Sequence, residues 1–202
     1  MADDQTDLLM RVRVASDDLA GDNQAAILGN DMLAIDGAGG PFVQGKCFLL
    51  DEFDFGLGNR FGTTSTTTEA KDGPSEPKRP SNWISDGREA LADLLLEIEP
   101  FSFRRLMDGA SLALFTACSQ SKTLPNASVI KRRAMTGQLG LYTFLRLDFT
   151  DVLITELRWQ EGRVVTEECK FICRSIRFRF RPQKADGSLG AAVEGKWPAV
   201  PG

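Results

Sequence analysis

The chain has 202 residues, with 24 lysines and arginines, 28 aspartates and glutamates, and no histidine. This length suits one domain with a sizeable insertion or tail, and 42% hydrophobic with 26% charged residues is typical of a soluble globular protein. The lack of histidine excludes Ser-His-Asp and Cys-His catalysis and the usual zinc sites. Only carboxylate, lysine, tyrosine or cysteine chemistry remains possible. We expect no metal and no cofactor.

The N-terminus and the cysteines favour a protein made in the cytoplasm. Asp3, Asp4 and Asp7 stand where a secretory signal carries basic residues, and no stretch approaches about 18 uninterrupted apolar residues. We expect neither a cleavable signal nor a membrane span. Cysteines stand at positions 47, 118, 169 and 173 without a CxxC pair, so we expect reduced, mostly buried thiols.

Charge is divided unevenly along the chain. Residues 1–59 carry 11 acidic and three basic side chains, a balance of −8, whereas residues 91–202 carry 16 basic and 12 acidic, a balance of +4. The net charge of −4 argues against a general affinity for nucleic acid. The separated signs favour complementary surfaces on neighbouring copies, unless these faces are simply solvated.

The first third predicts short strands followed by a long loop. Residues 8–14 alternate apolar and polar side chains, and Met32–Ile35 is a second strand candidate ended by a glycine-rich turn. Residues 46–57 also alternate, with a parity slip at Asp51 and Glu52 that predicts a bulge. The threonine- and proline-rich tract at about 59–86 predicts an inserted loop, because it has too little apolar surface to fix one conformation.

One helix is expected in the middle of the chain. Residues 91–99 fit a helix or a strand, and Phe101 and Phe103 extend their pattern. Residues 107–121 predict a helix that Asp108 caps, with one stripe of small and apolar side chains.

The remaining sequence predicts strands at 128–135, 139–149, 152–159 and within 164–181. In the last of these, Ile176, Phe178 and Phe180 occupy one face and Arg177, Arg179 and Arg181 the other. The pattern as a whole predicts a mainly β fold, a small β-barrel or two-sheet sandwich with one flanking α-helix. We expect a single domain over residues 1–202.

No enzymatic motif withstands a test. Gly56, Gly58 and Gly62 miss the GxGxxG spacing by one position, and no GxxxxGK[ST] string occurs. Residues 119–122 match SxxK, but neither SDN nor KTG accompanies them. We predict no catalytic or cofactor-binding residues and no enzyme.

The main basic cluster is the set of Arg177, Arg179 and Arg181, backed by Arg132 and Arg133. Binding of single-stranded nucleic acid would need aromatic side chains on the same face, and here they lie on the opposite face. We therefore expect a solvated or subunit-facing surface and no nucleic-acid partner.

Several segments resemble a known family. Residues 176–187, IRFRFRPQKADG, are similar to the closing strand and tail of the Hcp family, the tube proteins of bacterial type VI secretion systems. Residues 45–58, 101–122, 124–132 and 142–157 resemble its early strand, its strand and helix, the following strand and its long bent strand. The motif positions are Cys118, Ser119, Pro182, Gln183, Lys184, Ala185, Asp186 and Gly187.

The resemblance implies a barrel of two sheets with a flanking helix, assembled as homohexameric rings that stack into a tube expelled by sheath contraction. The implied partners are other copies, sheath and spike components, and effector proteins in the lumen, without insertion into a membrane. The five arginines of the basic cluster become candidates for a subunit interface or the lumen. The protein would be cytoplasmic and then secreted through the apparatus without a cleavable signal peptide.

The sequence differs from the family pattern in two places, and two other functions stay open. Residues 1–30 extend beyond the family's usual N-terminus, so either 8–14 or Met32–Ile35 could be its first strand, and the loop after Gly58 is unusually long. A phage tail or another contractile injection particle would use the same architecture. A monomeric ligand-binding β-barrel is the other alternative. About 15 residues follow Gly187, too few for a toxin domain.

Overall fold

The computed structural model describes residues 6–15, 17–21, 27, 29–37, 39–59, 96–134, 140–185 and 187–198. The chain divides into a main unit, Met1–Asp54 with Pro100–Gly202, and a hairpin unit, Phe55–Glu99. Nearly all of the predicted loop at 59–86 and part of the predicted extension at 1–30 lie outside the described residues. The expectation of a single domain stays a prediction.

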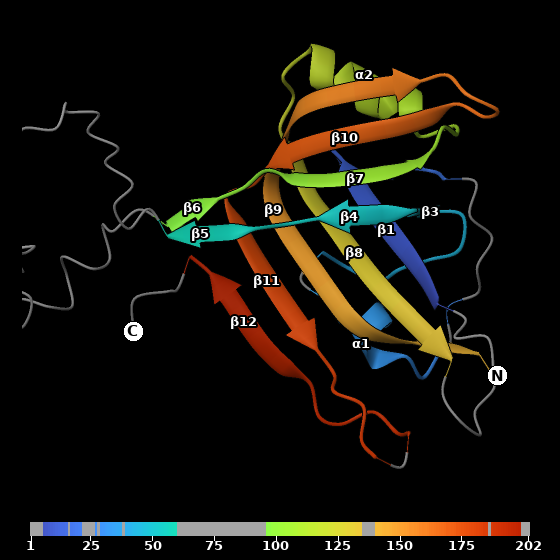
Figure 1. Ribbon diagram of the computed structural model, residues 1–202, viewed down its shortest axis with the longest axis vertical. Coiled ribbons are helices and arrows are strands. Elements are labelled where there is room, and N and C mark those ends of the chain that lie inside the picture. Colours follow the sequence, from blue (N-terminus) through green and yellow to red (C-terminus); the bar gives the residue numbers. More distant parts are fainter. Residues whose placement is uncertain are drawn as a thin grey trace, which may run out of the picture. The chain divides into compact units, whose positions relative to one another are not determined.

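The main unit contains one open antiparallel sheet (Figure 1). Its hydrogen-bonded path runs β2-β1-β8-β9-β10-β7-β4, with β3 beside β1 and the pair β11-β12 beside β9. The mainly β prediction is confirmed. The strands are β1 (Thr6–Val14), β2 (Asp17–Asp18), β3 (Phe48–Leu49), β4 (Glu52–Asp54), β7 (Phe101–Leu106), β8 (Leu124–Ala134), β9 (Leu141–Gln160), β10 (Thr166–Ile172), β11 (Ser175–Phe180) and β12 (Val193–Trp197).

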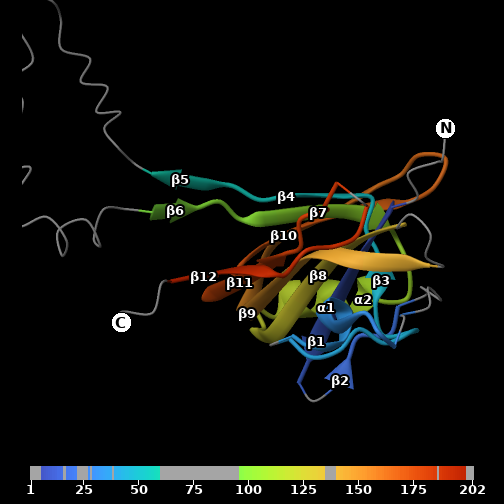
Figure 2. The same cartoon turned by 90° about the horizontal axis from the view of Figure 1, so that it is seen from below.

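Strand β9 belongs to both layers of this sheet. Its first half pairs with β8 and β11, and its second half pairs with β10. Between the halves, Asp151 has a φ of 50°, a left-handed conformation that Asp tolerates better than most residues. Figure 2 shows the resulting layers, with β4, β7 and β10 on one side and β1, β8 and β11 on the other. The two runs predicted at 139–149 and 152–159 are therefore one bent strand.

Phenylalanines fill the space between the layers. The rings of Phe101, Phe149 and Phe171 lie 4.9 to 5.0 Å apart, and Phe53 stacks on Phe101 at 5.3 Å. Phe101, Phe149 and Phe171 are almost completely buried. Aromatic pairs at such separations add about 0.5–1.5 kcal/mol beyond the burial of their area. This cluster joins β7, β9 and β10 across the bend of β9.

A buried arginine docks the predicted helix, which is α2 (Ser111–Ser119). Arg105 of β7 donates to Glu167 at 2.8 Å, to Asp108 at 2.6 Å and to Ser111 at 2.9 Å. Asp108 also accepts the N–H of Ala110 at 2.8 Å, in the turn before the helix. The N-cap is Ala110 without a side-chain cap, so the predicted cap at Asp108 is wrong and the helix begins later than the predicted residue 107. Sequence reasoning missed Arg105, whose role depends on a β10 residue distant in the chain.

The prediction of a strand at Met32–Ile35 is wrong. These residues form α1 (Met32–Ile35), a single turn whose Ala34 and Ile35 N–H groups donate to the carbonyl of Asp31. Four apolar residues are too few for periodicity to separate a strand from a helical turn.

The alternation in residues 46–57 breaks at Asp51 because the chain passes there from one layer of the sheet to the other. The N–H of Leu50 donates to Leu8 of β1, and the next N–H, of Asp51, donates to Arg104 of β7. The predicted continuous strand is thus divided into β3, β4 and β5 (Leu57–Asn59). In the hairpin unit, β5 pairs antiparallel with β6 (Leu96–Ile98), which confirms the strand alternative for that part of 91–99.

The four cysteines form no disulfide, as expected; Cys47 and Cys169 are buried, whereas Cys118 and Cys173 are half-buried. Burial raises the pKa of the Cys169 thiol well above its usual range. Burial also raises the pKa of Cys173 to about 11, so both thiols resist ionisation at neutral pH. Within the described part of the chain, no helix is long and apolar enough to cross a membrane.

We expect Phe149→Ala to lower the free energy of unfolding by about 3–5 kcal/mol, because it opens a cavity in the phenylalanine cluster. Leu112→Ala on α2 is the control: Leu112 is 64% exposed, so its truncation should cost less than about 0.5 kcal/mol. Urea unfolding followed by circular dichroism measures both values. Equal losses for the two variants would contradict this description of the core.

Candidate assembly surface

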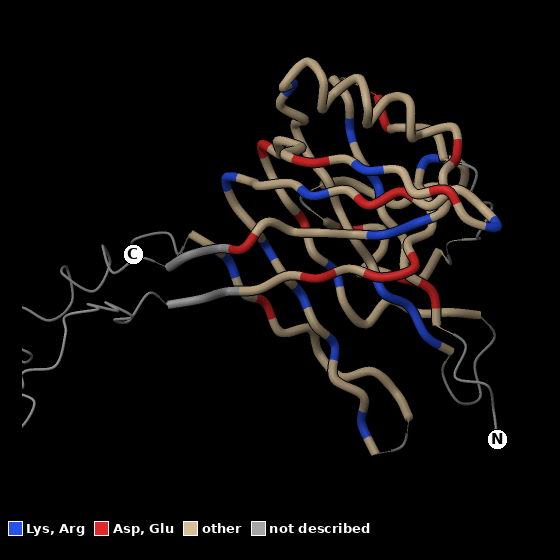
Figure 3. Tube along the Cα trace, turned by 45° about the horizontal axis from the view of Figure 1, so that its top comes forward, with Lys and Arg blue, Asp and Glu red and all other residues tan. Residues whose placement is uncertain are grey.

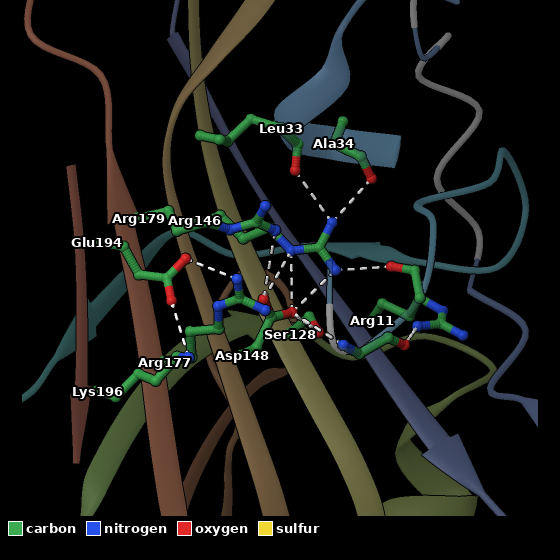
Figure 4. Close-up of polar contacts among 12 residues, drawn as sticks. Arg11, Leu33, Ala34, Ser128, Arg146, Asp148, Arg177, Arg179, Glu194 and Lys196 are labelled. Atoms are coloured by element: carbon green, nitrogen blue, oxygen red, sulfur yellow. Dashed lines mark hydrogen bonds and ion pairs between the residues drawn. The ribbon is translucent and has the colours of Figure 1, made fainter. Parts of the chain in front are cut away.

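The arginines of β11 share one face of the sheet with charged residues of β9 and β12 (Figure 4). Arg177 lies opposite Asp148 of β9, and Arg179 lies opposite Arg146. On the other side, the same two arginines face Lys196 and Glu194 of β12. Directly opposed residues of antiparallel strands project to the same face, so these six side chains form one charged cluster.

Arg146 and Asp148 form a fully buried ion pair at the centre of this cluster. The Arg146 Nε donates to both carboxylate oxygens of Asp148, at 2.9 and 3.0 Å. Its Nη1 donates to the carbonyls of Leu33 and Ala34 at 3.0 and 2.9 Å, and its Nη2 donates to Gly40 at 2.7 Å. The guanidinium thus joins β9 to α1 and the turn that follows it.

The oxygens of Asp148 are satisfied by further donors. Ser128 of β8 donates its hydroxyl at 2.7 Å, and the N–H of Gly39 donates at 3.3 Å. Arg11 of β1 donates to the Gly39 carbonyl and pairs with Asp18 at 2.6 Å. Each end of the buried pair is therefore surrounded by hydrogen bonds, as a buried charge requires.

Glycine at positions 37 and 39 allows the turn to approach the cluster. A Cβ on Gly37 would lie 1.9 Å from the guanidinium carbon of Arg146, and one on Gly39 would lie 2.0 Å from Oγ of Ser128. The GAGG string at 37–40 was predicted only as a turn, and its close contact with β9 was missed. A glycine-rich turn alone does not indicate which strand it will cover.

Asp31 anchors the start of the same segment. Its Oδ2 accepts the N–H of Thr143 at 3.0 Å and the Thr143 hydroxyl at 2.8 Å. Thr143 lies beside a bulge, because Lys131 and Arg132 of β8 pair with Leu145 and Thr143. The N–H of Thr143 therefore finds its partner in the covering segment.

The two arginines of β11 and Arg181, which follows it, have different surroundings. Arg177 donates to Glu194 at 2.6 Å, and this bond raises the pKa of Arg177 and lowers that of Glu194. Arg181 donates to the Gly190 carbonyl at 3.1 Å. Arg179 is only 7% exposed, so within one copy it is not on a solvated surface, and the subunit-facing alternative stays a prediction. The alternation is as predicted, but a pattern cannot show that the charged face would be covered.

Arg132 and Arg133 also contact residues of the same chain. Arg132 is buried and pairs with Asp7 of β1 at 2.5 and 2.8 Å. The guanidinium of Arg133 lies 4.5 Å above the ring of Phe144. Figure 3 shows acidic and basic residues interspersed over the described strands. Part of the charge difference between the first and last thirds is thus satisfied inside one copy, and an interface or lumen role for these arginines stays a prediction.

The family-motif positions after β11 build the turn that places β12. Pro182 accepts the N–H of Gly190 at 2.7 Å, Gln183 forms a bridge with Leu189, and Lys184 donates to Ser188 at 2.8 Å. Gly187 has a φ of 82°, while Asp186 lies outside the described residues. Of the others, Ala185 is part of this turn, Cys118 lies in α2 and Ser119 ends it. These contacts give the motif a structural role.

The opposite face of β11 and β12 presents an apolar surface. Phe178, Phe180 and Val193 are 41%, 43% and 62% exposed, and Gly195 leaves room for the Phe178 ring. Among the described strands, β12 pairs only with β11, so its outer backbone edge has no strand partner there. We call this edge with Phe178, Phe180 and Val193 the β12 surface. An open edge beside exposed apolar side chains is typical of a site of association.

Comparisons with known proteins agree with this architecture. The sequence profile of the family described as "Type VI secretion system effector, Hcp" matches residues 75–183, more than half of the chain. No curated protein matches the chain.

Solved structures of low sequence identity share the fold. One is described as the structure of a type six secretion system protein: 16% identity, TM-score 0.59, covering 95% of this chain and 93% of that one. Hcp1 from Salmonella typhimurium is 13% identical, with a TM-score of 0.57 and the same coverage. The secreted protein Hcp3 from Pseudomonas aeruginosa is 12% identical, with a TM-score of 0.53, covering 96% of this chain and all of that one.

We expect Arg146→Lys to lower the free energy of unfolding by about 2–4 kcal/mol, because lysine keeps the charge but cannot reach Asp148 and three carbonyls together. Amide hydrogen exchange should accelerate in residues 31–42. Arg158→Lys is the matched control, since Arg158 pairs with Glu156 on an exposed surface and should cost less than about 1 kcal/mol. Unchanged exchange at 31–42 would show that Arg146 does not anchor this segment.

Proposed function

Because the chain belongs to the Hcp family of type VI secretion proteins, we propose that it is a structural subunit of the inner tube. In this proposal, copies form homohexameric rings with an open lumen, and the rings stack into a tube that a contracting sheath expels. The protein is made in the cytoplasm and leaves the cell through the apparatus without a cleavable signal peptide. It works without a catalytic residue, cofactor or metal.

The observation that carries this proposal is the β12 surface. In an isolated copy, no described strand pairs with the outer edge of β12, and three large apolar side chains beside it are exposed. A contact between this surface and a different surface of the next copy is heterologous, and repeated heterologous contacts close into a ring when the rotation allows. The β12 surface therefore supports a cyclic assembly of identical subunits.

Charge supports an acidic counterpart on the neighbouring copy. Asp51, Glu52 and Asp54 are exposed at and beside β4, the strand that ends the other side of the sheet path. A cavity of about 470 Å³ beside β4 is lined by Asp51 and Glu52, and also by Lys131 and by Asp7, which pairs with Arg132 inside the chain. Lys196 of β12 is exposed on the charged face beside the β12 surface, where it pairs with Glu194. Attraction between this lysine and acidic residues of a neighbour would select the orientation of the copies more than their affinity.

The other proposed partners follow from family membership. Sheath and spike components would contact the assembled tube, and effector proteins would occupy its lumen. Neither nucleic acid nor direct insertion into a membrane is part of this proposal.

Light scattering coupled to size exclusion, with negative-stain imaging of the same fractions, tests the assembly. We expect particles of six subunits, a mass of about 133 kDa from the 22.2 kDa chain, with an open centre. Stacks of rings should form as concentration rises. A strict monomer at high concentration would contradict the tube proposal and favour a monomeric barrel.

Val193→Arg tests the β12 surface directly. We expect at least a tenfold loss of ring formation at fixed subunit concentration, because the new charge must be desolvated in the contact, a cost above about 1.4 kcal/mol. Val164→Arg is the control, as Val164 is 54% exposed in the turn between β9 and β10. Rings that form equally well from both variants would place the contact elsewhere.

A further inference from the structure

Arg179 is a buried cation, and two of its guanidinium nitrogens find no hydrogen-bond acceptor among the described residues. Its residue is 7% exposed, and its Nε and Nη2 atoms are buried and make no hydrogen bond. The nearest carboxylate contact is from Nη2 to Oδ2 of Asp148, at 3.6 Å, which is beyond hydrogen-bonding distance. A guanidinium in this position lacks the acceptors that burial normally demands.

The two carboxylates near Arg179 already bind other groups. Asp148 is bound by Arg146, Ser128 and the Gly39 N–H. Glu194 accepts from Arg177 at 2.6 Å and pairs with Lys196 at 3.2 Å.

The cluster has an excess of positive charge. It contains four cations, Arg146, Arg177, Arg179 and Lys196, against two carboxylates. Asp36, next to α1, is an exposed carboxylate whose charge acts on Arg177 and Arg179 but bonds to neither in this structure. Burial and the neighbouring Arg146 lower the pKa of Arg179, as expected for a cation short of acceptors.

We propose that Arg179, with Arg177 and Lys196 at its rim, forms a binding site for an oxyanion, a carboxylate or phosphate group, on the charged face of β9, β11 and β12. A guanidinium presents parallel N–H donors that match two oxygens of such a group. Cations of this cluster already bind a carboxylate within the chain, because Glu194 bridges Arg177 and Lys196. Nε and Nη2 of Arg179 have almost no exposed surface, so the more exposed side chains of Arg177 and Lys196 must move aside before an incoming oxyanion can supply the acceptor that Arg179 lacks.

Two sources can provide this oxyanion. One is a free anion such as inorganic phosphate. The other is an exposed carboxylate of a second copy, because the site adjoins β12, and this source rests on the proposed assembly. Both sources make the same contact with Arg179, so the site can be tested separately from its occupant.

The site is tested with inorganic phosphate and the full chain. At matched ionic strength, replacing chloride by phosphate at ten times Kd should raise the Tm by about 3–6 °C. Arg179→Met should lose this rise, because it removes the guanidinium and keeps an unbranched chain of similar length. Arg174→Met is the matched control: Arg174 is 80% exposed outside the cluster, so its variant should keep the rise.

The Tm of Arg179→Met in chloride separates loss of binding from loss of folding. Removal of a buried charge without acceptors should leave this Tm unchanged or raised. A large fall would show that Arg179 is already well paired within the chain, and it would overturn the proposal. A wild-type rise that Arg179→Met retains would also overturn it.

Sedimentation velocity distinguishes the two sources. If the occupant is a carboxylate of a second copy, Arg179→Met should weaken self-association at least tenfold, and phosphate should compete with association of the wild-type chain. If the occupant is a free anion, association should be equal in both chains while the phosphate response of the Tm persists. Absence of both effects overturns the site, whereas a monomeric chain with the phosphate response contradicts only the tube proposal.

Discussion

The buried ion pair of Arg146 with Asp148 is the contact on which the arrangement of the main unit depends. Taking two charges out of water costs several kcal/mol per ion, and only good geometry with further hydrogen bonds compensates for it. Three carbonyls of residues 33–40 supply acceptors for Arg146, and Ser128 and the Gly39 N–H supply donors for Asp148. The position of α1 and of the following turn is therefore tied to the charges of β9, because this segment supplies most of their hydrogen-bonding partners.

This constraint gives the first half of β9 two buried faces of opposite character. Phe149 packs with the phenylalanines between the layers, whereas Arg146 and Asp148 lie beneath α1 and the following turn. An alternating pattern normally indicates one buried and one solvated face, which is why Arg177, Arg179 and Arg181 were expected on a solvated or subunit-facing surface. The pattern identified the strands correctly, but it could not show that an acceptor-rich turn covers the polar side.

Other differences between prediction and structure have equally local causes. Met32–Ile35 forms a helical turn because Asp31 supplies its first acceptor, a contact that four apolar letters cannot reveal. The slip at Asp51 is a crossing between layers, since successive N–H groups reach β1 and β7. The residue pattern predicted two strands in place of β9, because the polar bend at Asp151 interrupts the alternation. Only the family resemblance predicted one long bent strand. Local pattern thus gave the elements, and contacts between distant segments decided their boundaries.

Ion pairs formed within one copy reduce the electrostatic attraction available between the copies of the proposed assembly. Asp7 and Arg132 come from the acidic and basic thirds of the sequence, yet they neutralise each other within one copy. Long-range attraction between neighbouring copies is weakened accordingly, since paired charges act only over short distances and salt screens the rest. The backbone edge of β12 and its apolar side chains remain available, and they are insensitive to salt. Burial of the β12 surface should therefore supply most of the affinity between copies, while the remaining exposed charges set the orientation in which they meet.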